Sequence, residues 1–162
     1  MIFNDGTRKI KFNDDIINTI KGFRQLEPSS AESGGLLLGR ENLSNNNLVV
    51  DNMTAPMPKD KRSRYRFVRK DKEHLNFFNE QYELSDGTIR YIGEWHTHPE
   101  DIPSYSSIDL KNWEEISGKS NVEDIYYHLI AGRTGLGVWM YSNKMDRPEL
   151  LIKTNWENYE KN

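Results

Sequence analysis

The sequence contains no cysteine among its 162 residues. Structural disulfides, thiolate nucleophiles and every zinc site that uses sulfur ligands are therefore excluded. A chain without cysteine is compatible with a reducing compartment, and we expect a cytoplasmic protein. The chain has four histidines and 25 acidic residues. These residues are the remaining candidates for metal ligands.

Long apolar runs and a strong net charge are also missing. No apolar stretch approaches the roughly 20 residues that span a membrane. The N-terminus lacks the basic region and apolar stretch that are typical of a signal peptide. The net charge of −3 and the pI near 5.8 give no global attraction to nucleic acid or to a membrane surface. We therefore expect neither of them as a partner.

The apolar and aromatic residues that are present are sufficient for one modest core. Apolar residues make up 35% of the chain and aromatic residues 11%, and we expect residues 1–162 to form a single domain. Helical periodicity predicts helices near 14–23 and 71–85 and a third from Ser106 or Ser107. The second of these helices is expected to turn Leu75, Phe78 and Tyr82 inward on one face. Strands are predicted at 35–39, 48–50, 88–95, 125–131, 137–141 and 150–152. Strands interleaved with about three helices predict an α/β fold.

A basic segment lies between the first strands and the second predicted helix. Residues 59–70 include seven cationic side chains and one acidic side chain, Asp60. Pro56 and Pro58 predict irregular structure from 55 to 69. A solvated loop and an electrostatic docking site for an acidic partner are both compatible with this composition. Nucleic acid is less favoured, because only Tyr65 and Phe67 add aromatic rings.

The triplet His96-Thr97-His98 follows a predicted strand. Side chains two apart on a strand share a face, with bases about 6.6 Å apart at a rise of about 3.3 Å per residue. Both imidazoles can then converge on one ion. Pro99 ends the strand and places the pair at its mouth.

Two polar residues at the start of the third predicted helix complete a candidate metal site. Asp109 follows His98 by eleven residues, and Ser106 precedes Asp109 by one helical turn. Two histidines, one carboxylate and a water make a four-coordinate catalytic zinc. Ser106-x-x-Asp109 also resembles a helix capping box, so capping and catalysis both remain open for Ser106.

The stretch from Glu32 to Gly39 (Glu-Ser-Gly-Gly-Leu-Leu-Leu-Gly), together with His-x-His, seven residues and Ser-x-x-Asp, resembles the JAMM motif of MPN-type peptidases. This resemblance implies an MPN/JAB-like fold with a central curved mixed sheet. It implies one zinc ion on His96, His98 and Asp109. Glu32 would be the general base, and Ser106 would hydrogen-bond the developing oxyanion.

The resemblance also implies a class of substrate. The family hydrolyses isopeptide or peptide bonds after the C-terminus of ubiquitin and ubiquitin-like proteins. The run from Gly93 to Pro99 looks most similar to small bacterial JAB-type enzymes. Those enzymes occur in operons with activating-like and conjugating-like enzymes, including anti-phage operons built around a cyclic-nucleotide synthase. The expected substrate is therefore a ubiquitin-like protein or a protein conjugate.

Other functions and other roles for single residues are compatible with parts of this pattern. A non-catalytic MPN scaffold would typically lack the ligands, whereas nucleobase deaminases need cysteines and zincins need His-Glu-x-x-His. Glu94 could orient a zinc ligand or pair with a lysine. Trp95 could contact substrate or lie in the core. His74 and His128 are expected to be structural.

Overall fold

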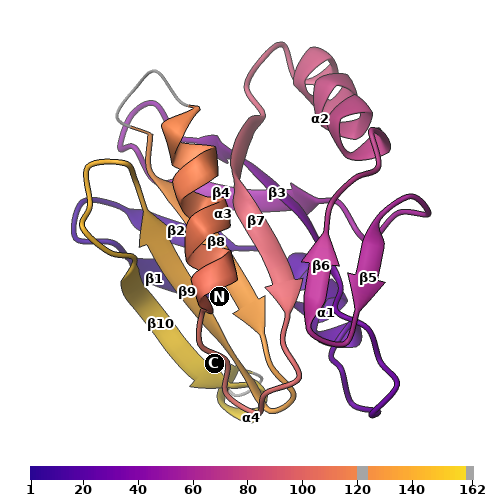
Figure 1. The fold of residues 1–162 in the computed structure, drawn as a ribbon. Helices are drawn as coiled ribbons and strands as arrows, with labels where there is room; N and C mark the ends of the chain where they lie inside the picture. Colours follow the sequence, from indigo (N-terminus) through magenta and orange to yellow (C-terminus); the bar gives the residue numbers. More distant parts are fainter. Residues whose placement is uncertain (120–123, 160–162) are drawn as a thin grey trace.

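One eight-stranded sheet organises the chain in the computed structural model, which describes residues 1–119 and 124–159 (Figure 1). The strand order is β1-β2-β4-β3-β7-β8-β9-β10. The pairs β2–β4 and β7–β8 are parallel and the others antiparallel, so the sheet is mixed. The strands are β1 (Ile2–Asn4), β2 (Lys9–Phe12), β3 (Gly34–Glu41), β4 (Leu48–Met53), β7 (Arg90–Thr97), β8 (Tyr126–Ala131), β9 (Gly135–Tyr141) and β10 (Glu149–Asn155).

Helices cover both faces of the sheet. On one face, α1 (Asp14–Gly22) buries Ile16, Ile17 and Ile20 in the main core, and the short α4 (Trp156–Tyr159) adds Trp156 to it. On the other face lie α2 (Glu73–Leu84) and α3 (Ser107–Gly118) (Figure 1). The predicted α/β fold with a curved mixed sheet is confirmed, with four helices in the described residues instead of about three.

The connection from β7 to β8 positions the candidate site. Because these neighbouring strands are parallel, the chain must cross back over the sheet between them, and it does so through α3. The N-terminus of α3 follows the carboxyl end of β7 after a loop of nine residues, 98–106. Two segments with polar side chains therefore meet at one end of the sheet.

The prediction of irregular structure from 55 to 69 was wrong. Lys61–Ser63 (β5) and Arg66–Val68 (β6) form a separate antiparallel hairpin. Pro56 and Pro58 lie before it in a segment without regular structure. The hairpin packs against the segment that leads into β3. The Phe67 ring lies where a β-carbon on Gly34 would be 2.6 Å from it, so glycine is required for this approach.

The inward face of α2 also differs from the prediction. Leu75 and Tyr82 were expected to point inward with Phe78, but they are 56% and 45% exposed. The helix instead buries His74, and Phe77 and Phe78 pack on the sheet. The first two strands were not predicted, because three or four residues are too few for a clear alternation. No helix in the described part of the chain is long and apolar enough to cross a membrane.

Candidate metal centre

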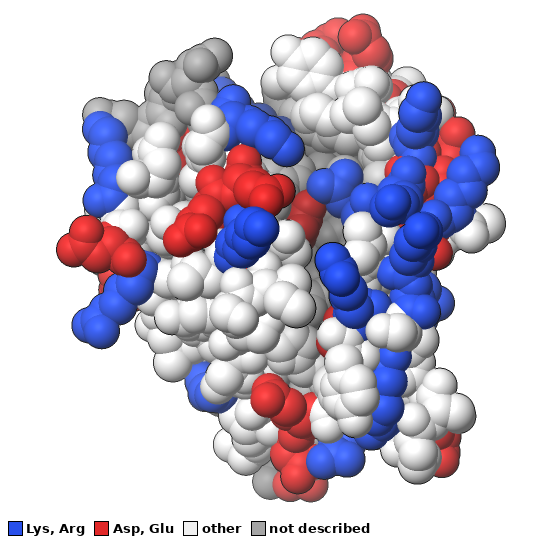
Figure 2. All heavy atoms as spheres, viewed as in Figure 1, with Lys and Arg blue, Asp and Glu red and all other residues white. Residues whose placement is uncertain are grey.

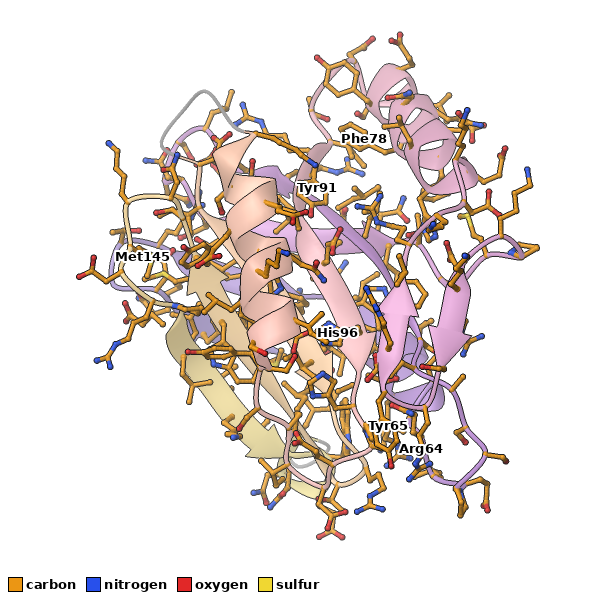
Figure 3. All side chains as sticks on the ribbon, viewed as in Figure 1. Arg64, Tyr65, Phe78, Tyr91, His96 and Met145 are labelled. Atoms are coloured by element: carbon orange, nitrogen blue, oxygen red, sulfur yellow. The ribbon has the colours of Figure 1, made fainter. Side chains whose placement is uncertain are left out.

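The carboxyl end of β7 and the first turn of α3 bring three ligand-type side chains together. The Nε2 atoms of His96 and His98 lie 3.0 Å apart. Asp109 Oδ1 lies 3.1 Å from His96 Nε2, and Asp109 Oδ2 lies 3.4 Å from His98 Nε2. All three side chains are almost buried, with exposed fractions of 10–13%. In Figure 3, His96 lies between α3 and the hairpin.

These donors fit a zinc ion. Zinc binds histidine nitrogen and carboxylate oxygen at about 2.0–2.2 Å in tetrahedral sites, which places neighbouring ligand atoms about 3.3 Å apart. The three distances in the protein lie close to that value, and the atoms form one group. Two neutral rings that point their Nε2 atoms at each other can share only one proton, so an ion between them suits their chemistry. Three protein ligands leave a fourth position open, as in catalytic sites.

Asp109 also belongs to the N-terminal cap of α3. The Ser106 hydroxyl and N–H both donate to Asp109 Oδ2, at 2.7 and 2.6 Å, and the Asp109 N–H donates to Ser106 Oγ at 3.2 Å. Burial alone would raise the pKa of Asp109, but the hydrogen bonds of His96 and His98 hold it well below its usual range. The carboxyl is therefore ionised and oriented before any ligand binds. Ser106 also lines the same cleft. Its hydroxyl is therefore placed for both roles that the sequence left open, helix capping and catalysis.

Glu32 lies just before β3, in the same cleft but outside the group of three. Its residue is 5% exposed, and the Phe67 N–H donates to its carboxylate. Burial raises the pKa of Glu32 to about 7, the charge of Asp109 adds to this shift, and the two histidines oppose it. A carboxyl group that titrates near neutral pH suits proton transfer.

The cleft lies between the hairpin and α3. Its volume is about 50 Å³, which is room for an ion and a water molecule. Figure 2 shows a hollow between these two parts of the surface. Besides Glu32 and the three ligand-type residues, Ser106, Ile108, Phe67 and Arg66 line it.

The other two candidate residues have different surroundings. Glu94 lines the cleft, and its Oε1 accepts a hydrogen bond of 2.6 Å from Arg69, so its partner is an arginine where the sequence suggested a lysine. The Trp95 side chain belongs to the main core, with 1% of the residue exposed, and its Nε1–H donates to the Thr54 carbonyl. The indole therefore lies in the core, which is one of the two roles that the sequence left open.

Two further groups, Arg62 and a buried pair of stacked rings, lie around the site. Arg62 donates from Nε to the Glu32 carbonyl at 2.7 Å and from Nη2 to Ser33 Oγ at 2.6 Å. The basic composition of the segment pointed to charge and gave no sign of this internal role. Under α3, the Trp113 ring stacks on His128, with centroids 4.4 Å apart and an interplanar angle of 8°. Burial lowers the pKa of His128 to about 3, so the ring is neutral and packs as part of the core.

Comparison with known proteins identifies the family of this chain. Residues 24–146 match a family described as prokaryotic homologs of the JAB domain. This match covers most of the chain, and the chain belongs to that family. The fold and the cluster at the end of β7 were the features that pointed to it.

Three relatives carry the name CD-NTase/cGAS isopeptidase. The one from Pseudomonas aeruginosa is 35% identical over 133 residues, which cover 82% of this chain and 83% of the relative. The one from Escherichia coli is 34% identical over 113 residues, or 70% and 71% of the two chains. The one from Vibrio cholerae is 39% identical over 98 residues, or 60% and 62%. A solution structure of a protein from Desulfitobacterium hafniense shares the fold, with a TM-score of 0.60 and 17% identity over 88% of this chain and 91% of that one.

Proposed function

We propose that this chain is a zinc-dependent isopeptidase. The observation that carries the proposal is the convergence of His96, His98 and Asp109 in one cleft, with Glu32 beside them as a carboxyl group outside the ligand set. Membership of the JAB family and relatives named as isopeptidases support the same reaction. Glu32 and Ser106 are the catalytic residues of the proposal.

Each residue has a defined task. When bound, zinc would lower the pKa of water and polarise a carbonyl group as a Lewis acid. Glu32 accepts a proton from the attacking water and delivers it to the leaving amine, as a buried carboxyl group beside the ligand set can. The Ser106 hydroxyl turns from Asp109 to donate to the oxyanion. The cap holds Asp109 in place during these steps.

The relatives' name suggests the substrate. We infer that the substrate is a conjugate in which the C-terminal carboxyl of a CD-NTase, or of a ubiquitin-like protein, is joined to an amine. We expect activating-like and conjugating-like enzymes, which form such a bond, as the corresponding partners. In this proposal the protein reverses conjugation by hydrolysing the bond that those enzymes form.

The test is cleavage of a purified conjugate in which a CD-NTase is joined to a lysine side chain. We expect the zinc-loaded protein to release the free CD-NTase, and a chelator to stop the release. Glu32→Gln should retain zinc and the melting temperature of the zinc-loaded protein but lose cleavage. Glu80→Gln, an exposed carboxyl on α2, is the matched control. Full turnover in Glu32→Gln would remove Glu32 as the base. A zinc-loaded wild type that binds the conjugate without cleaving it would indicate a scaffold.

A further inference from the structure

The hairpin β5–β6 has two chemically different faces. Its register pairs Arg62 with Phe67, and these side chains point towards Glu32 and Gly34. The other pairs are Lys61 with Val68 and Ser63 with Arg66. Because side chains alternate along a strand, these two pairs share the outward face. Lys70 follows β6 and lines the same outer surface.

The arginines on the inner side of the hairpin already bind partners within the protein. Arg62 binds main-chain and hydroxyl oxygens of the segment before β3, and Arg64 donates to the carbonyls of Glu27 and Pro28. Arg69 pairs with Glu94. These three side chains hold the hairpin in place and have no need of a partner from outside.

The cations of the outer side are different. Lys61, Arg66 and Lys70 are exposed, and within residues 1–119 and 124–159 their side chains make no ion pair and no hydrogen bond. They surround a shallow groove of about 340 Å³, which Arg62, Ser63 and Val68 also line. In Figure 2, Lys and Arg gather on the side of the molecule where the hairpin lies in Figure 1.

Arg66 connects this outer groove with the candidate site. It lines the outer groove and also the cleft that contains Glu32 and His96. A chain segment that leaves the cleft over β6 therefore passes an unpaired guanidinium first and two ammonium groups next. Since the whole chain has a net charge of −3, this basic face is a local reversal of the protein's charge. The positive electrostatic potential of this face attracts carboxylates to this side of the cleft.

We propose that the outer face of the hairpin binds an acidic, extended segment of the substrate protein next to the scissile bond. This inference rests on the proposed function and names a feature of the substrate. Arg66 contacts the carboxylate nearest to the bond, while Lys61 and Lys70 contact carboxylates further along the segment. Nucleic acid fits less well, because Tyr65, the exposed ring of the hairpin, lies under the Arg64 guanidinium at 5.6 Å instead of standing free for a base.

The first test measures binding and does not depend on catalysis. The probe is a fluorescein-labelled peptide of about twelve residues in which glutamate alternates with serine, compared with the same peptide carrying glutamine. Three exposed charge contacts of about 0.5 kcal/mol each correspond to roughly tenfold tighter binding of the acidic peptide. Fluorescence anisotropy should show this difference, and added salt should remove it.

A matched pair of triple variants locates the effect. Lys61→Gln, Arg66→Gln and Lys70→Gln together should abolish the preference for the acidic peptide. Lys9→Gln, Lys11→Gln and Lys111→Gln change the net charge equally at exposed positions away from the groove and should retain it. Equal binding of both peptides by the wild type, or the same loss in both variants, would overturn the proposal. Tighter binding of a single-stranded oligonucleotide than of the acidic peptide would overturn it as well, in favour of nucleic acid.

The second test separates this inference from the proposed function. A conjugate with acidic residues near the scissile bond should show a lower KM than the same conjugate with these residues changed to glutamine. Identical KM values would overturn the inference and leave the isopeptidase activity established. Selective binding of the acidic peptide without cleavage of either conjugate would sustain the acidic docking face and count against the proposed function.

Discussion

The guanidinium of Arg62 holds the main-chain carbonyl of Glu32 at 2.7 Å. A second contact runs the other way, because the Glu32 N–H donates to the Ser63 carbonyl at 2.8 Å. The backbone of the proposed base is thus fixed on both sides by the β5 strand. A basic side chain in this hairpin therefore acts on an acidic group in the cleft without touching its carboxylate.

Arg62→Ala should lower kcat about tenfold while the zinc content and KM stay near wild type. The reason is that a small displacement of a catalytic carboxyl is costly for proton transfer. Arg62→Lys, which retains one donor to the carbonyl, should recover part of the rate. Arg64→Ala is the control, since it removes an arginine of the same hairpin that binds Glu27 and Pro28 instead. If both alanine variants lose activity in proportion to melting temperature, Arg62 has only a structural role.

Zinc should stabilise the folded protein through the three converging side chains. At a free zinc concentration of about one hundred times Kd the gain is about 2.7 kcal/mol, which raises the melting temperature by several degrees. His96→Asn should lose this shift. Glu94→Gln, which changes a carboxylate of the same cleft outside the ligand set, should retain it. Differential scanning fluorimetry and metal analysis measure both effects, and a wild type that binds no zinc would refute the assignment.

Glu32 should make the zinc-free protein less stable as the pH rises. Its pKa is about 7 in the folded chain against an ordinary value of 4.5, so folding favours the protonated form. The stability contributed by this form is complete below about pH 4.5 and is lost as the pH rises through 7. Glu32→Gln should therefore exceed the wild type by up to about 3 kcal/mol at pH 8 and by little at pH 4. Urea unfolding with a chelator present checks this, and a constant difference at both pH values would contradict it.

Local spacing explains why the convergence of His96, His98 and Asp109, the proposed metal ligands, could be predicted from the sequence. The strand period places His96 and His98 on one face, and one helical turn joins Ser106 to Asp109. The parallel β7–β8 pair then brings both segments to the same end of the sheet. The fold class followed from the same alternation of strands and helices.

The hairpin and the orientation of α2 could not be predicted, because polar contacts distant in sequence determine both. Thr54 Oγ1 and His74 Nδ1 lie 2.6 Å apart, and His74 Nε2 lies 2.8 Å from Asp60 Oδ2. These two buried contacts hold the His74 ring towards the interior, and Leu75 is therefore left exposed. Hydrophobic periodicity carries no information about such a network.

Ser106→Ala should separate the two tasks of this residue. Loss of the cap should cost about 1 kcal/mol of folding free energy. Loss of the oxyanion donor should lower kcat by about a hundredfold, well beyond the effect of that destabilisation. Ser107→Ala, at the next position and without a capping hydrogen bond, is the control. A variant that loses stability but retains kcat would leave Ser106 as a helix cap alone.

Asp60 should make the stability of the folded protein depend on pH in the acidic range, whereas Asp15 should not. Its carboxylate accepts hydrogen bonds from the N–H groups of Met57, Lys70 and Asp71 and faces His74 Nε2. It therefore joins the two ends of the segment that contains the hairpin. Burial alone would raise the pKa of Asp60, but these hydrogen bonds hold it at about 2.

Because the pKa of Asp60 is lower in the folded chain than its ordinary 3.8, its contribution is present above about pH 4 and is lost as the pH falls towards 2. Asp60→Asn should cost about 2 kcal/mol at pH 7, and the difference from wild type should shrink on acidification. Asp15→Asn, an exposed substitution in α1, should be neutral throughout. Since the hairpin fixes Glu32, Asp60→Asn should also lower kcat, and unchanged activity would show that the hairpin can loosen without moving the base.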